Sequence, residues 1–479
     1  MRKDVIIRHL GLIFLFNSAF LFISAMISGL LGESSYIPLV YSTLIALIFG
    51  VFPLIFVPQV YTIQTREGIF IVVAGWLASC LMGVLPYVLW GGEFTLSNAW
   101  FESVSGFTTT GASILTDVES LPKGLLFWRA STHWIGGIGI ILFALLLFPR
   151  TGSSRLTLIR SELSDISQQS FRAKASDILR IILYVYLGLT LVEVILLIFA
   201  GVGLFDAITH SFATIATGGF STRNMSIAYF DSLQVEIIIM VFMVLSGLHF
   251  GLLFATITGK RENIFRSKVT AFYLLFLGVG ILLITLELYY TGYSDFGGAL
   301  RKASFQVISL GTTTGFATTD TAAWPYLTRL ILIYFSIQCA CVGSTSGGLK
   351  FDRVLIILKS IGKQVKLFLH PRAIISSKLG KIKLSQELEL FVLAFTVLYV
   401  LVIFISTLML SAMGMDIETS FSATVATIGN VGPGFGEVSS LGNYSSLPSF
   451  AKMILTIDML MGRLELFSLL SLFYVRSWR

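Results

Sequence analysis

Phe101–Ser113 reads FESVSGFTTTGAS, and the same plan returns three more times along the chain. In each copy a stretch of helical character runs into a Gly-rich or Thr-rich end. The other copies are THSFATIATGGFS at Thr209–Ser221, FQVISLGTTTGFA at Phe305–Ala317 and SATVATIGNVGPG at Ser422–Gly434, and the aligned glycines are Gly111, Gly219, Gly315 and Gly432. The glycines recur at intervals of 108, 96 and 117 residues, which indicates one element used four times.

Long apolar runs separate these glycine-centred segments. Of 479 residues, 55% are apolar and only 12% are charged, far from the roughly 25% charge of a soluble domain. Runs of about 20 apolar residues are long enough to cross a bilayer. Soluble enzymes, disordered scaffolds and disulfide-built secreted modules are therefore excluded. Ten membrane spans are predicted, at residues 8–31, 36–62, 68–91, 124–149, 177–201, 235–258, 269–291, 325–359, 386–413 and 449–475.

Each glycine-centred segment lies between two predicted spans. Four pseudo-equivalent units close naturally around an axis, and irregular backbone at membrane depth is tolerated only inside protein or along a water-filled cavity. The predicted fold is an all-α polytopic membrane protein, with two N-terminal spans and four pseudo-symmetric repeats of span, pore helix and span around a central pore. The predicted domains are 1–67 for the N-terminal spans and 68–176, 177–268, 269–385 and 386–479 for repeats 1 to 4, the third with a broken second span.

Basic residues are concentrated on one side of the predicted membrane. If the first residue is cytoplasmic, the segments on that side hold 24 of the 33 Lys and Arg residues. This imbalance is typical of positive-inside sorting, so both termini are predicted to be cytoplasmic. The net charge of +7 is therefore attributed to topology and not to nucleic-acid binding. Cys80, Cys339 and Cys341 lie in apolar stretches and are interpreted as small core residues.

The glycine-centred segments suit the coordination of a dehydrated cation. Backbone carbonyl oxygens replace the hydration shell of an ion without a formal charge that would trap it. Glycine adopts positive φ and lets carbonyls turn toward an axis without narrowing the passage. Each preceding half-helix would point its negative C-terminal end at the ion. The predicted filter residues are Thr109, Thr110, Gly111, Thr217, Gly218, Gly219, Thr313, Thr314, Gly315, Asn430, Val431 and Gly432.

In these residues the chain resembles the Trk/Ktr/HKT superfamily of potassium uptake proteins, whose subunits have four span-pore-span repeats with one filter glycine each. The resemblance covers essentially the whole chain, and the extra pair of N-terminal spans resembles the Trk branch. It implies potassium uptake, with K+ as the transported ion, no enzymatic activity and a bacterial inner-membrane location. It also implies a homodimer on a cytosolic RCK-type (TrkA-like) ring that binds NAD(H) or ATP, so that nucleotide would act through the partner.

The eighth predicted span is interrupted by Gly343, Ser344, Thr345, Ser346, Gly347 and Gly348, followed by Lys350. Glycines inside a helix cost about 1 kcal/mol each, so a regular helix should break here and its backbone should line a cavity. A tolerated kink packed against neighbouring helices is the alternative. In Trk-like proteins the equivalent break obstructs permeation below the filter, which implies a gate at this position.

Arg463 lies midway along the last predicted span, in the sequence MLMGRLELF. A charge at this depth costs about 3 kcal/mol and should face water or a partner. Facing the pore, it would raise a barrier to cations, and similar arginines in Trk-like proteins lie beneath the filter. The alternative is an ion pair with Glu465 or another buried acid. Residues two apart do not share a helical face, which disfavours a pair with Glu465.

Two other classes of function remain open from the residues. A secondary transporter could couple uptake to H+ or Na+ by alternating access, although repeats of one shared orientation favour a pore. An intramembrane enzyme would need a nucleophile with a base, or metal ligands at depth, and no such spacing occurs. His133 and His249 are interpreted as hydrogen-bonded residues of helix packing, because runs of small residues lie beside them.

Two basic segments, Arg150–Asp177 and Lys350–Gln386, are too long for bare connections. Their default interpretation is a solvated charged face against membrane lipid. The alternative is a docking surface for a regulatory partner, in which Lys363 and Lys366 are the candidate residues. No nucleotide site is predicted in this chain itself.

Overall fold

The structure is a computed structural model that describes residues 2–58, 65–147, 175–260, 263–373, 375, 378–379 and 382–473, and most of these residues lie in helices. Six of its helices are long and apolar enough to cross a membrane, and a bent helix pair makes a seventh candidate span. A further long helix is α5 (Lys123–Leu147). The six long apolar helices are α1 (Lys3–Leu31), α2 (Tyr36–Phe56), α3 (Thr65–Trp90), α8 (Ala175–Phe199), α12 (Lys268–Tyr290) and α16 (Gln386–Ala412).

Four shorter helices, here called the half-helices, lie between the long ones: α4 (Leu96–Phe107), α9 (Leu204–Ile215), α13 (Phe296–Gly311) and α17 (Ile417–Ile428). Their starts are encoded locally, because Thr95, Asp295 and Asp416 each accept a hydrogen bond from the backbone of the first helical turn. Each half-helix then runs into one glycine loop. Glycine loops 1 to 4 are residues 108–113, 216–221, 312–317 and 429–434.

Three spans are interrupted. The predicted span at 235–258 is wrong as a continuous helix, because α10 (Leu233–Gly247) and α11 (Phe250–Ile257) are bent by 108°. His249 starts the second piece by accepting a hydrogen bond from the Gly251 backbone at 3.0 Å. The predicted span at 449–475 is also broken, since Glu465 has a positive φ of 61° between α18 (Ser449–Arg463) and α19 (Leu466–Phe473). The third interruption separates α14 (Tyr326–Ile337) from α15 (Phe351–Leu369).

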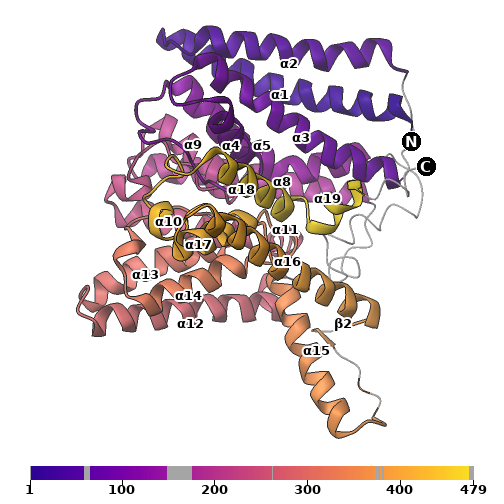
Figure 1. Ribbon diagram of the computed structural model, residues 1–479, viewed down its shortest axis with the longest axis vertical. Coiled ribbons are helices and arrows are strands. Elements are labelled where there is room, and N and C mark those ends of the chain that lie inside the picture. Colours follow the sequence, from indigo (N-terminus) through magenta and orange to yellow (C-terminus); the bar gives the residue numbers. More distant parts are fainter. Residues whose placement is uncertain are drawn as a thin grey trace.

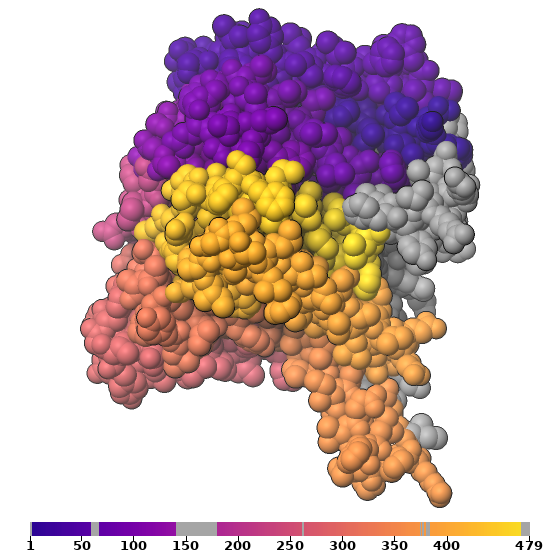
Figure 2. Space-filling model, viewed as in Figure 1, coloured from indigo at the N-terminus to yellow at the C-terminus, as the bar shows by residue number. Residues whose placement is uncertain are grey.

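The four repeats follow one another around a closed ring. Within each repeat the first span packs on its own half-helix, in the pairs α3 with α4, α8 with α9, α12 with α13 and α16 with α17. The second span packs on the half-helix of the next repeat, in the pairs α5 with α9, α10 with α13, α14 with α17 and finally α18 with α4. The C-terminal helices therefore lie between the first and third repeats (Figures 1 and 2). The predicted architecture of two N-terminal spans and four pseudo-symmetric repeats is confirmed.

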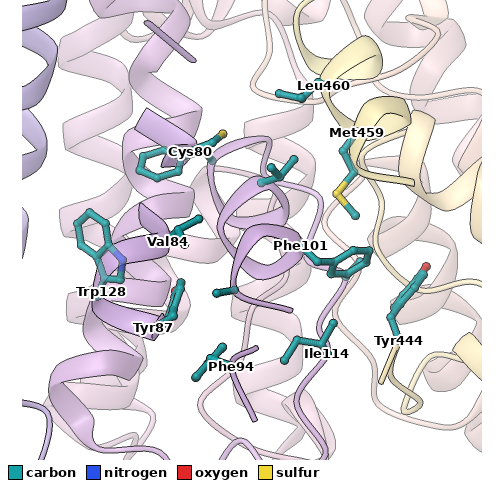
Figure 3. Close-up of a cluster of buried hydrophobic side chains, with 14 of the residues drawn as sticks. Cys80, Val84, Tyr87, Phe94, Phe101, Ile114, Trp128, Tyr444, Met459 and Leu460 are labelled. Atoms are coloured by element: carbon teal, nitrogen blue, oxygen red, sulfur yellow. The ribbon is translucent and has the colours of Figure 1, made fainter. Parts of the chain in front are cut away.

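The largest hydrophobic cluster joins the N-terminal helices to repeats 1 and 4, and it includes Phe101, Trp128 and Tyr444 (Figure 3). All three cysteines are free and buried. Helix α15 projects from the body of the molecule (Figure 1). The remaining described elements are the 3-10 helices η2 (Ser226–Phe230), η3 (Ile264–Arg266), η4 (Thr321–Ala323) and η5 (Gly436–Val438) and the paired strands β1 (Lys378–Leu379) and β2 (Ile382–Lys383).

Candidate cation pathway

The four aligned glycines meet around one centre. A Cβ added to Gly432 would lie 2.5 Å from the carbonyl oxygen of Thr110, in loop 1. We call each contact between a loop glycine and a carbonyl of the next loop a joint. At the other three joints the space is smaller still, because the added Cβ would collide with a carbonyl of the next loop. These joints place Gly111 against Gly218, Gly219 against Thr314 and Gly315 against Val431. The loops thus contact one another in the order 1, 2, 3, 4, 1, and no side chain fits at any of the four positions.

Each half-helix ends in the same way. Two backbone hydrogen bonds reverse the chain, as Thr110 N to Ser105 O at 2.9 Å and Thr109 N to Gly106 O at 3.0 Å show for loop 1. This is a Schellman ending, in which the residue after the helix cap has positive φ. The residues in that position are Thr109 (52°), Thr217 (53°), Thr313 (63°) and Asn430 (53°), followed two residues later by the glycines at 78° to 97°.

Positive φ is costly for a β-branched residue such as threonine and usually marks a function. In each loop two residues with positive φ are separated by one residue, and this alternation changes the direction of successive backbone carbonyls. All four residues that carry the strain are completely buried. The negative C-terminal ends of four half-helices point at the same region, which favours a positive ion there. The predicted filter residues are therefore brought together by the fold.

Three different devices hold the four loops. In loops 1 and 3 a threonine pair closes the turn, because the Thr108 and Thr110 hydroxyls, and likewise those of Thr312 and Thr314, lie 2.8 Å apart. In loop 2 the His133 ring stacks on Phe220 with ring centroids 4.0 Å apart and lies against Gly218. Loop 4 has neither device. Instead its Asn430 side chain donates to Thr110 Oγ1 and to Met459 O, both at 2.9 Å.

A buried ion pair that the sequence reasoning missed supports loops 1 and 2. Arg129 Nε donates to Glu102 Oε1 at 2.6 Å, and Arg129 Nη1 donates to Ser221 O at 2.9 Å. Glu102 also accepts hydrogen bonds from Ser113 Oγ and Ile114 N, both at 3.0 Å. Both charged side chains are at most 5% exposed. The pair ties the half-helix α4, the end of loop 1 and loop 2 together, which no spacing in the sequence indicates.

The loop between α14 and α15, residues 338–350, packs directly against the glycine loops. Its neck is closed, because Cys339 N donates to Leu349 O at 2.9 Å and Phe351 N donates to Ala340 O at 3.0 Å. At its tip a Cβ on Gly347 would strike the Asn430 side chain, and one on Gly348 would lie 3.0 Å from Gly429. The predicted gate residues Gly343 to Gly348 thus lie in one closed loop, whose Gly347 and Gly348 lie against loop 4.

This loop also completes the broken span of repeat 2. Cys341 N donates to Gly247 O, and Phe250 N donates to Gly343 O, both at 3.1 Å. The backbone groups that lose their helical partners between α10 and α11 therefore form hydrogen bonds with the loop that interrupts the span of repeat 3. Unpaired backbone at membrane depth is costly, so the two breaks stabilise each other. His249, which is 9% exposed, lies at this junction against Gly343.

Two cations accompany the loop. Arg463, 4% exposed, donates to the Thr345 carbonyl oxygen and to Gly136 O, the latter at 2.9 Å. Lys350 binds within its own loop, to Ser346 O and to Ser346 Oγ. Glu465 contacts a different partner, since it forms an ion pair with Arg353 at 2.6 Å. The predicted alternative in which Glu465 pairs with Arg463 is thus wrong.

Among the described residues there is no group of three or more His, Cys, Asp or Glu side chains that could hold a metal ion. The pathway consists of backbone oxygens, hydroxyls and an amide. Oxygen ligands without formal charge suit a weakly bound, monovalent cation. Of the two basic segments, interpreted as a charged face against lipid or alternatively as a docking surface, 150–177 lies largely outside the described residues.

The fold is that of a four-repeat membrane protein in which four glycine loops meet around one centre. The sequence matches the TrkH family, described as cation transport proteins, over residues 39–477. The chain therefore belongs to the TrkH family, and the predicted membership of the Trk branch is confirmed.

Relatives match over most or all of their length. "Trk system potassium uptake protein TrkH" of Escherichia coli is 37% identical over 87% of both chains, and the Halomonas elongata protein of the same name is 34% identical over 100% of both. TrkG of Escherichia coli is 33% identical over 87% of this chain and 86% of its own. The crystal structure of the potassium transporter TrkH from Vibrio parahaemolyticus superimposes with a TM-score of 0.89 at 32% identity over 100% of both chains.

Proposed function

We propose that this protein takes up potassium across the bacterial inner membrane through a gated, channel-like pore, with both termini in the cytoplasm. The observation that carries the proposal is the closed ring of four glycine loops, in which each glycine abuts a carbonyl of the next loop. Relatives over the whole chain are named potassium uptake proteins. In this proposal the carbonyl oxygens of the ring replace the hydration shell of K+ and so select this ion.

In this proposal the filter consists of the predicted residues 109–111, 217–219, 313–315 and 430–432. The glycines permit the close approach, and the strained residues before them turn their carbonyls toward the ion. Four half-helix C-termini add partial negative charge without the desolvation cost of four carboxylates. The four loops differ in sequence, so the ring is less regular than one made of identical subunits.

The proposed gate is the loop between α14 and α15 together with Arg463. The loop lies against Asn430 at the base of loop 4, and Arg463 links its Thr345 carbonyl to Gly136 of α5. A positive charge at this point opposes the passage of a cation. Displacement of the loop would break links to neighbouring repeats, among them the backbone bonds at Gly247 and Phe250 and the bond from Arg463.

Reconstitution into liposomes tests this function. With K+ on one side and Na+ on the other, the reversal potential should show a preference for K+. Unitary currents, or fluxes far above about 10³ ions per second, would exceed the typical turnover of a coupled carrier cycle. A flux that stops when a proton or sodium gradient is collapsed would instead identify an H+- or Na+-coupled transporter.

We also propose that the protein forms a homodimer and docks on a cytosolic nucleotide-binding ring. The projecting helix α15 supports this, because its exposed side chains Leu358, Ile361, Val365 and Phe368 recur at intervals of three or four residues and share one face. Lys366 on the same helix is exposed, whereas Lys363 forms an ion pair with Glu389 at 2.9 Å. Lys366→Glu is therefore the cleaner probe: it should abolish co-purification with the ring, whereas Lys302→Glu should not.

A further inference from the structure

Loop 4 is the irregular member of the ring. Loops 1 and 3 have a threonine pair that closes the turn, and loop 4 has Gly429 and Val431 at the corresponding positions. Its glycine also makes the loosest joint, because the 2.5 Å gap for a Cβ on Gly432 is the widest of the four. This joint lies between the last loop of the chain and the first. Besides the Asn430 amide of loop 4 itself, a side chain from outside the loop contacts this joint.

Tyr444 spans this joint from the segment between η5 and α18. Its hydroxyl donates to the carbonyl oxygen of Gly432 at 2.7 Å, and its backbone N donates to Ser113 O at 2.8 Å. One residue thus contacts the glycine of loop 4 and the end of loop 1. The side chain is 2% exposed, and its ring packs on Phe101 of the half-helix α4 with centroids 5.3 Å apart (Figure 3). The surrounding packing keeps the hydroxyl in place.

The bond to Gly432 distinguishes loop 4 from the other three. Within the described part of the chain, the carbonyl oxygens of Gly111, Gly219 and Gly315 accept no hydrogen bond. A hydroxyl that donates to a carbonyl draws part of its negative charge and fixes its orientation. Gly432 therefore offers a weaker and more rigid ligand than its three counterparts.

We propose that Tyr444 is a specificity-determining positioning residue, which sets the orientation and the ligand strength of the Gly432 carbonyl. This inference rests on the proposed potassium filter. Selectivity is explained either by a cavity of fixed size or by the field strength of the carbonyls. In the first account, loss of the hydroxyl lets the ring contract around a smaller ion. In the second account, the released carbonyl becomes a stronger ligand, and a stronger ligand field favours the smaller ion. Both accounts predict a weaker preference for K+ over Na+.

The test compares Tyr444→Phe with Tyr87→Phe in reconstituted protein. Tyr87 lies in the same hydrophobic cluster, is fully buried and stacks on Phe94 at 4.6 Å, but its hydroxyl has no hydrogen-bond partner among the described residues (Figure 3). Loss of one hydrogen bond of ordinary strength predicts that Tyr444→Phe lowers the K+/Na+ permeability ratio about fivefold. Tyr87→Phe should keep the parent ratio, and both variants should show similar thermal unfolding midpoints.

A variant with 4-aminophenylalanine at position 444 retains a weaker donor. Its permeability ratio should fall between those of the parent and Tyr444→Phe. If the Phe variant does not accumulate in the cell, the 4-aminophenylalanine variant is compared with the parent in its place. A parent ratio in either position-444 variant would overturn the inference while leaving the potassium filter intact. A parent protein without preference for K+ would instead reject the proposed function.

Discussion

Arg463 donates a hydrogen bond to the carbonyl oxygen of Thr345, so the last helix pair of the protein holds the tip of the loop between α14 and α15. Its second donor binds Gly136 O of α5 at 2.9 Å. Because the side chain is 4% exposed, both bonds form in a medium of low dielectric constant and are stronger than in water. The arginine therefore links repeats 1, 3 and 4.

Arg463→Ala should increase basal cation flux, since it removes both a positive barrier and the bond to Thr345. Rb+ uptake into proteoliposomes without a regulatory partner measures the effect. Arg266→Ala, at an exposed arginine, is the control and should leave the uptake rate unchanged. Deletion of Gly343 to Gly348 should raise the flux in the same direction. An uptake rate equal to that of the parent in both changes would remove the gate assignment.

Gly219→Ser should reduce the preference for K+ over Na+. The glycine has φ of 78°, and a Cβ there would collide with the carbonyl oxygen of Thr314. The backbone strain alone is worth about 1–3 kcal/mol, so the ring must distort. Gly188→Ser is the matched control, because open space surrounds this glycine. Bi-ionic reversal potentials check the prediction, and identical values for the two variants would contradict it.

Asn430→Thr gives loop 4 the residue that the other loops have, and it should nevertheless impair selectivity. Threonine lacks the amide donor that binds Thr110 Oγ1 and Met459 O. Breaking two buried hydrogen bonds costs about 1–3 kcal/mol each where the partner stays unsatisfied. Asn17→Thr is a close control, because Asn17 is fully buried and donates to Ser79 Oγ at 3.1 Å, and neither residue belongs to a glycine loop. Selectivity lost equally in both would refute a specific role for Asn430.

Arg353 and Glu465 couple the projecting helix α15 to the break between α18 and α19. Glu465→Gln should destabilise the protein by about 3–5 kcal/mol, because it leaves a buried guanidinium without its counter-charge. The guanidinium also stacks over Phe395 at 4.0 Å. The exchange Arg353→Glu with Glu465→Arg should recover part of this loss. Thermal unfolding in detergent measures both, and additive effects of the two single changes would argue against a direct coupling.

Asp416 makes the stability of repeat 4 dependent on pH. Hydrogen bonds from Thr419 hold the pKa of its carboxyl below the ordinary value of about 3.9. A lowered folded-state pKa stabilises the protein above pH 3.9, and this contribution is lost as the pH falls through the folded-state pKa. Asp416→Asn retains a helix cap at every pH. The Asp416 contribution is lost over a range of about pH 5 to about pH 2.5. Across this range the unfolding midpoint of the Asn variant should therefore change less than that of the parent.

Much of the pathway was readable from the chain because repetition is a local pattern. Four glycines at matching positions predicted four loops, and the glycines of residues 343–348 predicted a weak point in a helix. Both inferences need only neighbouring residues. The breaks at Leu248 and Glu465 were missed, because neither has a glycine-rich or proline signal. They are stabilised by distant partners, such as the loop that bonds to Gly247 and Phe250.

The sequence by itself determined the solvent, the number of repeats and the chemistry of the loops, since apolar length, glycine position and charge placement act within one segment. Only the tertiary structure decided how the ring closes. Asn430 reaches Thr110, Tyr444 reaches Ser113 and Arg129 reaches Ser221 across different repeats. Such contacts depend on the packing of helices that are far apart in the sequence. The low dielectric of the membrane interior makes each unpaired polar group costly and so selects one arrangement.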